Sequence, residues 1–393
     1  MRRAYLDHAS TAPLRPCVRD AIVEVLDTPA GDPGRLHSEG RRHRVALEEA
    51  RSAVAGLLGA RAREVVFTSG GTESVNSAVA GAVERGRRER MNAGDTTAPH
   101  AVTTAVEHSS VHEALERAGV EATVVGVDRF GRYDADDVVA AVRPDTVLVS
   151  VQTANHEVGT RQPWRSVAEG LARRPGEGVP DGPLLHVDAC ADAANPEGLA
   201  FVDSGVDLCS VTAHKAGGPA GIGALLVRRG LRIPPLIVGG AQERDRRGGL
   251  ENVAAAVGFG ALADDLAESG HLENEAAAAR RHTDRLSQAA TSTGGVSLFG
   301  DSDDRMAHLV CLGVEGVEAE PILLGLDQRG VAVHSGSSCS SETLEPSPVL
   351  RAMGVDADHS LRASVGWNTT DADVDLFAQA FSSVVEGLRS LRS

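Results

Sequence analysis

The sequence lacks the features that mark secreted, membrane-spanning and metal-cluster proteins. Its 393 residues contain five cysteines, none in a C-x-x-C pair: Cys17, Cys190, Cys209, Cys311 and Cys339. Thiols so few and so scattered do not suit a disulfide framework, a structural zinc site or a resident iron–sulfur cluster. No hydrophobic run is long enough to span a membrane, and the N-terminus meets charge too early for a signal peptide. We therefore expect a cytoplasmic protein without a metal site or a membrane partner.

Basic residues are in the minority. The chain has 39 lysines and arginines against 55 acidic residues, which gives a net charge of −16 at pH 7. Binding of nucleic acid requires clustered positive charge to neutralise phosphates, so we do not expect it here. With 42% hydrophobic residues, the chain can bury one large core and a smaller one, which favours two domains.

Short apolar runs alternate with amphipathic segments over the first two-thirds of the chain. Strands are expected at residues 64–68, 101–106, 122–127, 147–151, 184–188, 206–212 and 223–228. Helices are expected at residues 41–58, 74–90, 111–118 and 134–142. This alternation predicts an α/β fold with a mostly parallel sheet, in which ligands bind at the carboxyl ends of the strands. An alanine-rich helical stretch, residues 253–290, then leads to a second domain.

One lysine directly follows a buried strand. Lys215 ends the run Thr212-Ala213-His214-Lys215 and precedes a glycine-rich turn. Burial disfavours the ammonium form, so such a lysine can form a Schiff base with a carbonyl such as that of pyridoxal phosphate. The alternative is an ordinary surface lysine. Asp188, at the end of another apolar strand, favours the first interpretation, because an acid there can keep the cofactor's ring nitrogen protonated.

Two further motifs lie at expected strand ends. Ser69-Gly70-Gly71-Thr72 joins a strand to a helix start, where free N–H groups, the helix dipole and the Thr72 hydroxyl can bind an anion. The motif matches neither a Walker loop nor a dinucleotide fingerprint, and an ordinary turn is the alternative. His108 follows another strand, where it can stack on a cofactor ring and shuttle a proton or have a structural role.

A cysteine lies among small polar residues late in the chain. The segment 335–341 reads Ser-Gly-Ser-Ser-Cys-Ser-Ser, and Cys339 is its only thiol. These surroundings are typical of neither a core cysteine nor a metal ligand. A reactive thiol needs exposure and mobility, and this composition predicts both. The alternative is a cysteine that is exposed without a role.

Together these motifs resemble those of the pyridoxal-phosphate-dependent cysteine desulfurases of the class-V aminotransferase superfamily, in the branch with a long cysteine loop. The similarity runs from residues 5–13 to residues 361–366, and its most specific parts are His214-Lys215 and the cysteine loop. It implies a fold-type-I pyridoxal-phosphate-dependent transferase. A mostly parallel seven-stranded sheet would form a large domain, residues 16–255. A smaller α+β domain, residues 1–15 and 256–393, would carry the cysteine loop.

The resemblance implies how the cofactor would be held. Lys215 would bind it covalently, Asp188 would contact its ring nitrogen, and His108 would stack on its ring and move protons. The phosphate would be bound by Gly71, Thr72, Thr212 and His214. The active sites would lie at the interface of a homodimer.

The resemblance also implies the substrate chemistry. Arg362 would clamp the carboxylate of L-cysteine, and Asn155 would also lie at the substrate. Cys339 would attack the substrate sulfur, so that L-alanine is released and a persulfide on Cys339 passes its sulfur to an acceptor protein. The alternative is a C–S lyase or desulfurase that acts on a modified cysteine or an S-conjugate.

The chain departs from the family pattern near the expected site. His156 stands where the family has an asparagine that contacts the cofactor's phenolic oxygen, and Ala191 where a glutamine makes a second contact. Leu250 replaces a threonine that reaches the phosphate across the dimer. Asp32 replaces an asparagine near the substrate carboxylate, where an anion opposes binding unless Arg35 pairs with it. We therefore expect His156 to contact the cofactor and Asp32 to restrain use of free L-cysteine, which favours the alternative function.

Overall fold

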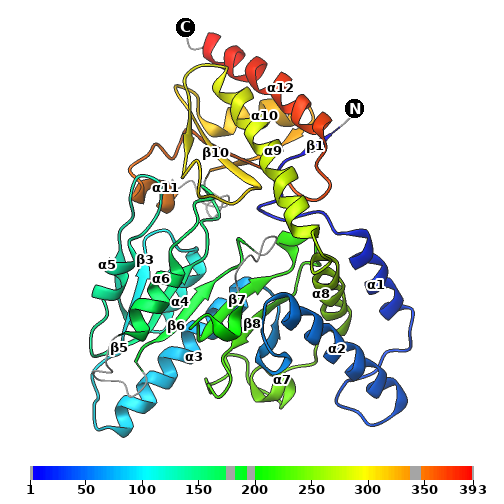
Figure 1. Cartoon of the computed structure of the whole chain (residues 1–393), viewed down its shortest axis with the longest axis vertical. Helices are drawn as coiled ribbons and strands as arrows, with labels where there is room; N and C mark the ends of the chain where they lie inside the picture. The colour runs from blue at the N-terminus through cyan, green and yellow to red at the C-terminus, as the bar shows by residue number, and fades with distance from the viewer. Residues whose placement is uncertain (1–2, 174–181, 193–199, 337–346, 392–393) are drawn as a thin grey trace.

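The larger part of the molecule is built around a seven-stranded sheet (Figure 1). The structure is a computed structural model that describes residues 3–173, 182–192, 200–336 and 347–391. In spatial order the strands are β2 (Val65–Thr68), β8 (Gly223–Val227), β7 (Leu208–Thr212), β6 (Leu184–Asp188), β5 (Thr146–Gln152), β3 (His100–Thr104) and β4 (Glu121–Val125). β8 runs antiparallel to its two neighbours, and the remaining pairs are parallel. The predicted mostly parallel, seven-stranded sheet is confirmed.

Helices cover both faces of this sheet. On one face lie α3 (Gly71–Asn92) and α4 (Ser109–Arg117), whose apolar side chains share a core with alternate strand residues. The other face is covered by α2 (Ser38–Leu57), α5 (Ala135–Ala140), α6 (Trp164–Ala172) and α8 (Val253–Leu266). Strands buried on both faces are mostly apolar without a polar alternation, as in the β5 sequence Thr-Val-Leu-Val-Ser-Val-Gln, all of whose residues are buried.

A second, smaller core lies at the end of the molecule that holds both chain termini (Figure 1). Its antiparallel sheet has the order β12 (His334–Ser335), β13 (Ser360–Ser364), β10 (Leu309–Val314) and β9 (Val296–Phe299). β1 (Ala4–Tyr5) pairs in parallel with β11 (Val331–Ala332). The helices of this part are α9 (His271–Thr291), α10 (Ala319–Gln328), α11 (Pro348–Ala352) and α12 (Asp371–Ser390).

The passage between the two cores differs from the single helical stretch expected at residues 253–290. It consists of α8 and α9, which are separated at Gly270, a residue with φ of 78°. α8 ends at Leu266, and Gly270 is the N-cap of α9 in a left-handed conformation that glycine adopts without a steric penalty. The apolar residues of α8 belong to the larger core. The predicted division of the chain at residue 255 stays a prediction.

The remaining elements are short or irregular. They are α1 (Pro16–Leu26), the 3-10 turns η1 (Ala62–Glu64), η2 (Phe201–Asp203) and η3 (His214–Ala216), and α7 (Gln242–Asp245). Within α7, the residues Glu243, Arg244 and Asp245 have φ values of 47°, 58° and 63°. Three successive non-glycine residues in the left-handed region are strained, so surrounding contacts must hold them. Among the described residues, no helix is both long and apolar enough to cross a membrane.

Candidate active site

A cavity of about 260 Å³ lies where three parallel strands end. Gln152, Asp188 and Thr212, the last residues of β5, β6 and β7, all line it. The cavity brings together the predicted site residues Gly71, Thr72, His108, His156, Asp188, Thr212, His214, Lys215 and Arg362. This position agrees with the expectation that ligands bind at the carboxyl edge of such a sheet.

Lys215 is the only lysine of the chain, since the other basic residues are all arginines. It lies in η3, directly after β7. Burial, together with the neighbouring charge of Lys215, lowers the pKa of His214 to about 4. His214 is therefore a neutral imidazole at pH 7, and its Nδ1 lies 2.8 Å from Thr212 Oγ1. The cavity thus contains one side-chain amine and a neutral hydrogen-bonding pair beside it.

The start of α3 forms another wall of the cavity. A Cβ at Gly71 would lie 2.6 Å from Cys190 Sγ, so only glycine fits there. Glu73, in the first turn, is tied back by the Ser69 N–H at 2.8 Å and by Arg247 Nε at 3.0 Å. Burial opposes ionisation of Glu73, but its hydrogen bonds to Arg247 and Ser69 lower its pKa. Arg247 thus compensates the negative charge of Glu73, and the N-terminus of α3 remains suited to binding an anion.

Asp188 lies at the end of β6 and is 7% exposed. Its Oδ1 accepts the Cys190 N–H at 2.9 Å. A second acid, Glu107, lies nearby, and its Oε1 accepts from Gln152 N at 3.1 Å and from Thr104 Oγ1 at 2.6 Å. Burial raises the pKa of Glu107 to about 8, and the charge of Asp188 acts in the same direction. Of the two buried acids, Glu107 is therefore protonated at neutral pH.

Two imidazoles face the cavity from different elements. The ring centres of His108 and His156 are 5.3 Å apart, with the planes at 58°. His108 Nδ1 accepts the Ser110 N–H at 3.1 Å as the N-cap of α4, so a neutral His108 carries its proton on Nε2. His156 Nε2 is 3.6 Å from the buried Glu157 Oε1. Both imidazoles are thus oriented by their neighbours at the wall of the cavity.

Arg362 reaches the cavity from β13 of the smaller sheet, with its side chain 1% exposed. Nη2 lies 3.1 Å from Asp7 Oδ1 and 2.6 Å from Ser10 Oγ. Nη1 donates to the His156 carbonyl at 2.9 Å, whereas Nε is buried and has no hydrogen-bond partner among the described residues. The guanidinium is therefore oriented in advance, and Asp7 partly neutralises its charge.

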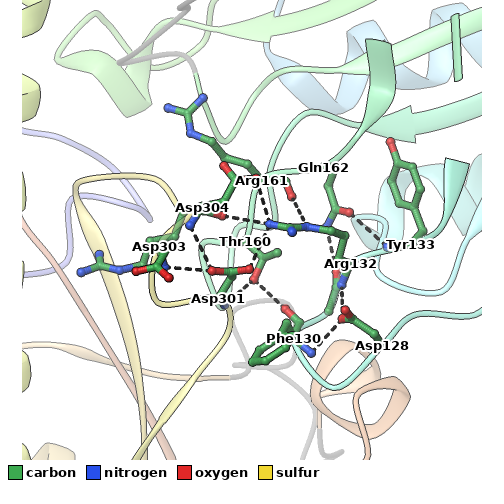
Figure 2. Close-up of polar contacts among 12 residues, drawn as sticks. Asp128, Phe130, Arg132, Tyr133, Thr160, Arg161, Gln162, Asp301, Asp303 and Asp304 are labelled. Atoms are coloured by element: carbon green, nitrogen blue, oxygen red, sulfur yellow. Dashed lines mark hydrogen bonds and ion pairs between the residues drawn. The ribbon is translucent and has the colours of Figure 1, made fainter. Parts of the chain in front are cut away.

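The segment that carries His156 is fastened to the smaller part of the molecule (Figure 2). Residues 153–162 turn back on themselves, and Thr160 forms an isolated bridge with Arg305. The Asp301 N–H donates to Thr160 Oγ1 at 3.0 Å. Arg132 Nη2 reaches Asp301 at 3.2 Å and Asp304 at 2.9 Å. One wall of the cavity is thus positioned by loops from both cores.

Two predicted substrate residues do not line the cavity. Asp32 pairs with Arg35 at 3.0 Å, as the sequence suggested, and its side chain is 38% exposed. Asn155 is fully buried: its Nδ2 donates to the Val106 carbonyl at 3.1 Å, and its Oδ1 accepts the Glu157 N–H at 2.9 Å. These contacts give Asn155 a role in holding the turn before His156.

Three other positions that the sequence singled out, Cys339, Ala191 and Leu250, lie in different surroundings relative to the cavity or outside the described residues. Cys339 lies outside the described residues, so its assignment stays a prediction. Ala191 lines the cavity, where its methyl group makes no polar contact. Leu250 is 64% exposed and lies in the glycine- and arginine-rich segment that follows α7.

The cavity also includes residues that the sequence reasoning missed. Ser10, Gln152 and Cys190 line it, and Glu107 accepts a hydrogen bond from the N–H of Gln152. Gln152 could have been found, because it directly follows the strand predicted at residues 147–151, at the same sheet edge as Asp188. The count of lysines was a further signal, since a lone lysine in an arginine-rich chain singles out Lys215. The buried position of Glu107 has no counterpart in the local sequence pattern.

Comparisons with known proteins agree over nearly the whole chain. Residues 4–377 match the family model described as aminotransferase class-V. The chain is 38% identical to a cysteine desulfurase IscS of Dictyoglomus turgidum, over 99% of this chain and 96% of the relative. It is 36% identical to cysteine desulfurase IscS 1 of Archaeoglobus fulgidus, over 98% of both chains. A solved structure of a NifS-like protein superposes with a TM-score of 0.87 at 28% identity, covering 98% of this chain and all of the other.

Proposed function

The chain belongs to the class-V aminotransferase family and is a cysteine desulfurase, and we propose that it breaks the C–S bond of L-cysteine with pyridoxal phosphate bound to Lys215. The observation that carries this proposal is the single cavity in which Lys215, Asp188 and the start of α3 meet. Each of these groups suits a different part of the same cofactor.

The residues present fit pyridoxal phosphate. The N-terminus of α3 offers N–H groups to a phosphate, and the glycine at its first position leaves space that any side chain would fill. Asp188 can accept from the ring nitrogen, and Lys215 is the only side-chain amine that can bond the aldehyde. The phosphate would be held by Gly71, Thr72, Thr212 and His214, of which the imidazole contributes a hydrogen bond rather than a charge.

When bound, pyridoxal phosphate supplies an electron sink that stabilises negative charge next to the amino group of the substrate. Asp188 keeps the ring nitrogen protonated, which that sink requires. His108 can hold a proton on Nε2 for transfer at the substrate, because Ser110 occupies Nδ1. His156 would donate to the phenolic oxygen. Arg362 attracts the substrate carboxylate and, held by Asp7 and Ser10, orients it.

Sulfur transfer is assigned to Cys339. Its thiolate would attack the substrate sulfur, so that the S–S bond of a persulfide forms while the C–S bond breaks and L-alanine leaves. The persulfide would then pass its outer sulfur to the thiol of an acceptor protein. A C–S lyase needs no such carrier, and the argument from Asp32 for that function is weakened, because Asp32 pairs with Arg35 away from the cavity.

We also propose a homodimer whose interface includes the segment after β8. Leu236, Ile237, Val238 and Leu250 are exposed apolar residues, 36–77% accessible. They lie together, since the Gly248 N–H donates to the Ile237 carbonyl at 2.8 Å. The Arg247–Glu73 ion pair connects this surface to the first turn of α3. A second copy that covers the patch would therefore lie next to the phosphate site.

The proposal is tested by incubating the purified protein with L-cysteine and a reductant, then measuring alanine and sulfide. Borohydride should fix the cofactor to Lys215, and Lys215→Ala should lose both the yellow colour and the activity. Cys339→Ser should keep the spectral response to L-cysteine but form no persulfide. Cys17→Ser, which changes an exposed cysteine of α1, is the matched control and should behave as wild type. Alanine formation by Lys215→Ala, or a persulfide in Cys339→Ser, would contradict these assignments.

A further inference from the structure

The turn that carries Lys215 is held from outside by one arginine. The N–H of Arg15 donates to the Gly217 carbonyl at 2.9 Å. Its side-chain Nε donates to the Ala216 carbonyl, also at 2.9 Å. Arg15 thus binds the two peptide carbonyls that follow Lys215.

The fit between this turn and the N-terminal segment leaves little room. Gly217 has φ of 91°, and a Cβ there would lie 2.8 Å from Arg15 Cγ and 3.2 Å from the Pro13 carbonyl oxygen. The N–H of Ala12 donates to the His214 carbonyl at 2.9 Å. The N-terminal segment therefore contacts the turn on both sides of the lysine.

The guanidinium of Arg15 binds two acids at the same time. Its Nη1 and Nη2 lie 2.7 Å from the two oxygens of Glu275, and Nη1 lies 2.9 Å from Asp265 Oδ2. Its Cζ is 5.7 Å from the ring centre of Trp367, and the side chain is 5% exposed. Burial acts against ionisation of Glu275, but the hydrogen bonds and charge of Arg15 lower the pKa of Glu275. The cluster is therefore ionic around a nearly buried guanidinium, while the side chains of Asp265 and Glu275 are 23% and 25% exposed.

The two acids lie on the helices that connect the two cores. Asp265 is near the end of α8 and Glu275 in the first turns of α9. Because one guanidinium binds both helices and the Ala216 carbonyl after Lys215, it couples the turn to the α8–α9 connection. We propose that Arg15 is a positioning residue for Lys215, through which α8 and α9 fix the lysine for capture of the cofactor. The inference rests on the proposed role of Lys215.

A lysine could not replace Arg15 in full. The planar guanidinium has five N–H donors and can bond a carbonyl through Nε while its other nitrogens hold a carboxylate on both oxygens. An ammonium group is a single point and cannot reach both partners in these directions. We therefore expect Arg15→Lys to keep the charge but lose the Nε bond to the Ala216 carbonyl, whereas the main-chain bond to the Gly217 carbonyl remains in every Arg15 variant.

The test uses the full-length chain stripped of cofactor with hydroxylamine. Rates of pyridoxal phosphate capture are followed by absorbance, and Lys215 is the only side-chain amine that can contribute. Hydrogen exchange at residues 214–218 is measured on the same samples and does not depend on the cofactor. Arg15→Met should slow capture about tenfold and speed exchange by a similar factor, the effect of losing a charge-assisted hydrogen bond. Arg15→Lys and Glu275→Gln should shift both rates in the same direction, about threefold.

Arg90→Met provides a matched control. Arg90 is similarly buried, with its side chain 10% exposed, and pairs with Asp95 at 2.5 Å, near the end of α3 that lies away from the cavity. It should leave capture and exchange within about twofold of wild type. Because Arg15→Met could reduce folding, Glu275→Gln, which keeps Arg15, is the second variant on which the proposal depends.

The outcomes separate this inference from the proposed function. Slower capture and faster exchange in the Arg15 and Glu275 variants, but not in Arg90→Met, support the positioning role. Unchanged exchange in folded Arg15→Met, or an equal effect of Arg90→Met, overturns it. If wild type captures no pyridoxal phosphate, the proposed function is wrong, and the exchange rates alone decide whether Arg15 holds the turn.

Discussion

Replacing Glu243 by glutamine should destabilise the chain strongly, because Glu243 neutralises a buried arginine. Nη1 and Nη2 of Arg51 lie 2.6 and 2.8 Å from the two oxygens of Glu243. The side chains of Arg51 and Glu243 are 1% and 2% exposed. Glu243 Oε2 also accepts the Phe67 N–H of β2 at 2.9 Å. The pair therefore fastens the strained turn of α7 to the edge of the large sheet.

The size of the expected loss in unfolding free energy depends on the partners that Arg51 keeps in Glu243→Gln. Burial disfavours its charge, but the hydrogen bonds and charge of Glu243 raise the pKa of Arg51 above its usual value. Arginine keeps its proton in proteins even without a carboxylate partner, so Arg51 stays ionised in Glu243→Gln, with the Val65 carbonyl at 3.1 Å and Glu48 at 3.4 Å as its remaining partners. Breaking a buried pair costs about 3–5 kcal/mol, and these partners place the expected loss of unfolding free energy near 3 kcal/mol.

Urea unfolding followed by circular dichroism measures this loss. Glu243→Gln and Arg51→Met should each lower the unfolding free energy, whereas Arg51→Met combined with Glu243→Met should cost less than the sum of the single changes, because neither charge is left buried alone. Arg285→Gln, which breaks exposed ion pairs with Asp371 and Asp375, is the control and should cost less than about 1 kcal/mol. Additive effects of the two single changes would refute the reasoning.

The remaining predictions concern a buried acid, a surface acid and a strained residue. The pKa of Glu107 is about 8 in the folded chain and ordinary in the unfolded chain, so the free energy of unfolding should fall as pH rises from about 5 to 8. Glu107→Gln should remove that fall, as measured by urea midpoints at about pH 5 and about pH 8. A fall that persists in Glu107→Gln would contradict the assignment. Asp32→Asn should change the KM for L-cysteine by less than about twofold, since Asp32 pairs with Arg35 outside the cavity; a large drop in KM would restore it to the substrate site. Asp245→Gly should stabilise the chain by about 0.5–1 kcal/mol, because its φ of 63° suits glycine, and an unchanged melting temperature would argue against strain there.

The sequence predicted the large sheet well, because its signals are local. The strand predicted at residues 184–188, Leu-Leu-His-Val-Asp, is mostly apolar, and it matches β6 to the residue. The residues at the carboxyl ends of the predicted strands, among them Asp188 and Thr212, could be placed together because parallel strands end at one edge. The smaller sheet was less predictable, since β12 has two residues and depends on pairing with β13.

Other parts of the site depend on contacts between distant segments, which no local pattern contains. Arg362 was expected to hold a carboxylate, but its pairing with Asp7 joins residues more than 350 positions apart. Asn155 matched a family motif, yet its burial against Val106 follows from how the turn folds back on β3. Asp32 was predicted to repel a substrate carboxylate because of its charge. Its partly exposed position beside Arg35, which weakens that effect, is a property of the folded chain.

The pairing of β1 with β11 has a consequence for synthesis of the protein. Ala4 pairs with Val331, so the first strand is made 327 residues before its partner. At about 5–20 residues per second, it waits on the ribosome for roughly 15–65 seconds. The larger core, complete with α8, can fold during that time. Leu6 is fully buried in the finished fold, but it stays exposed until the smaller core forms. Co-translational chaperones would therefore be expected to bind the nascent N-terminus until the last helices leave the exit tunnel.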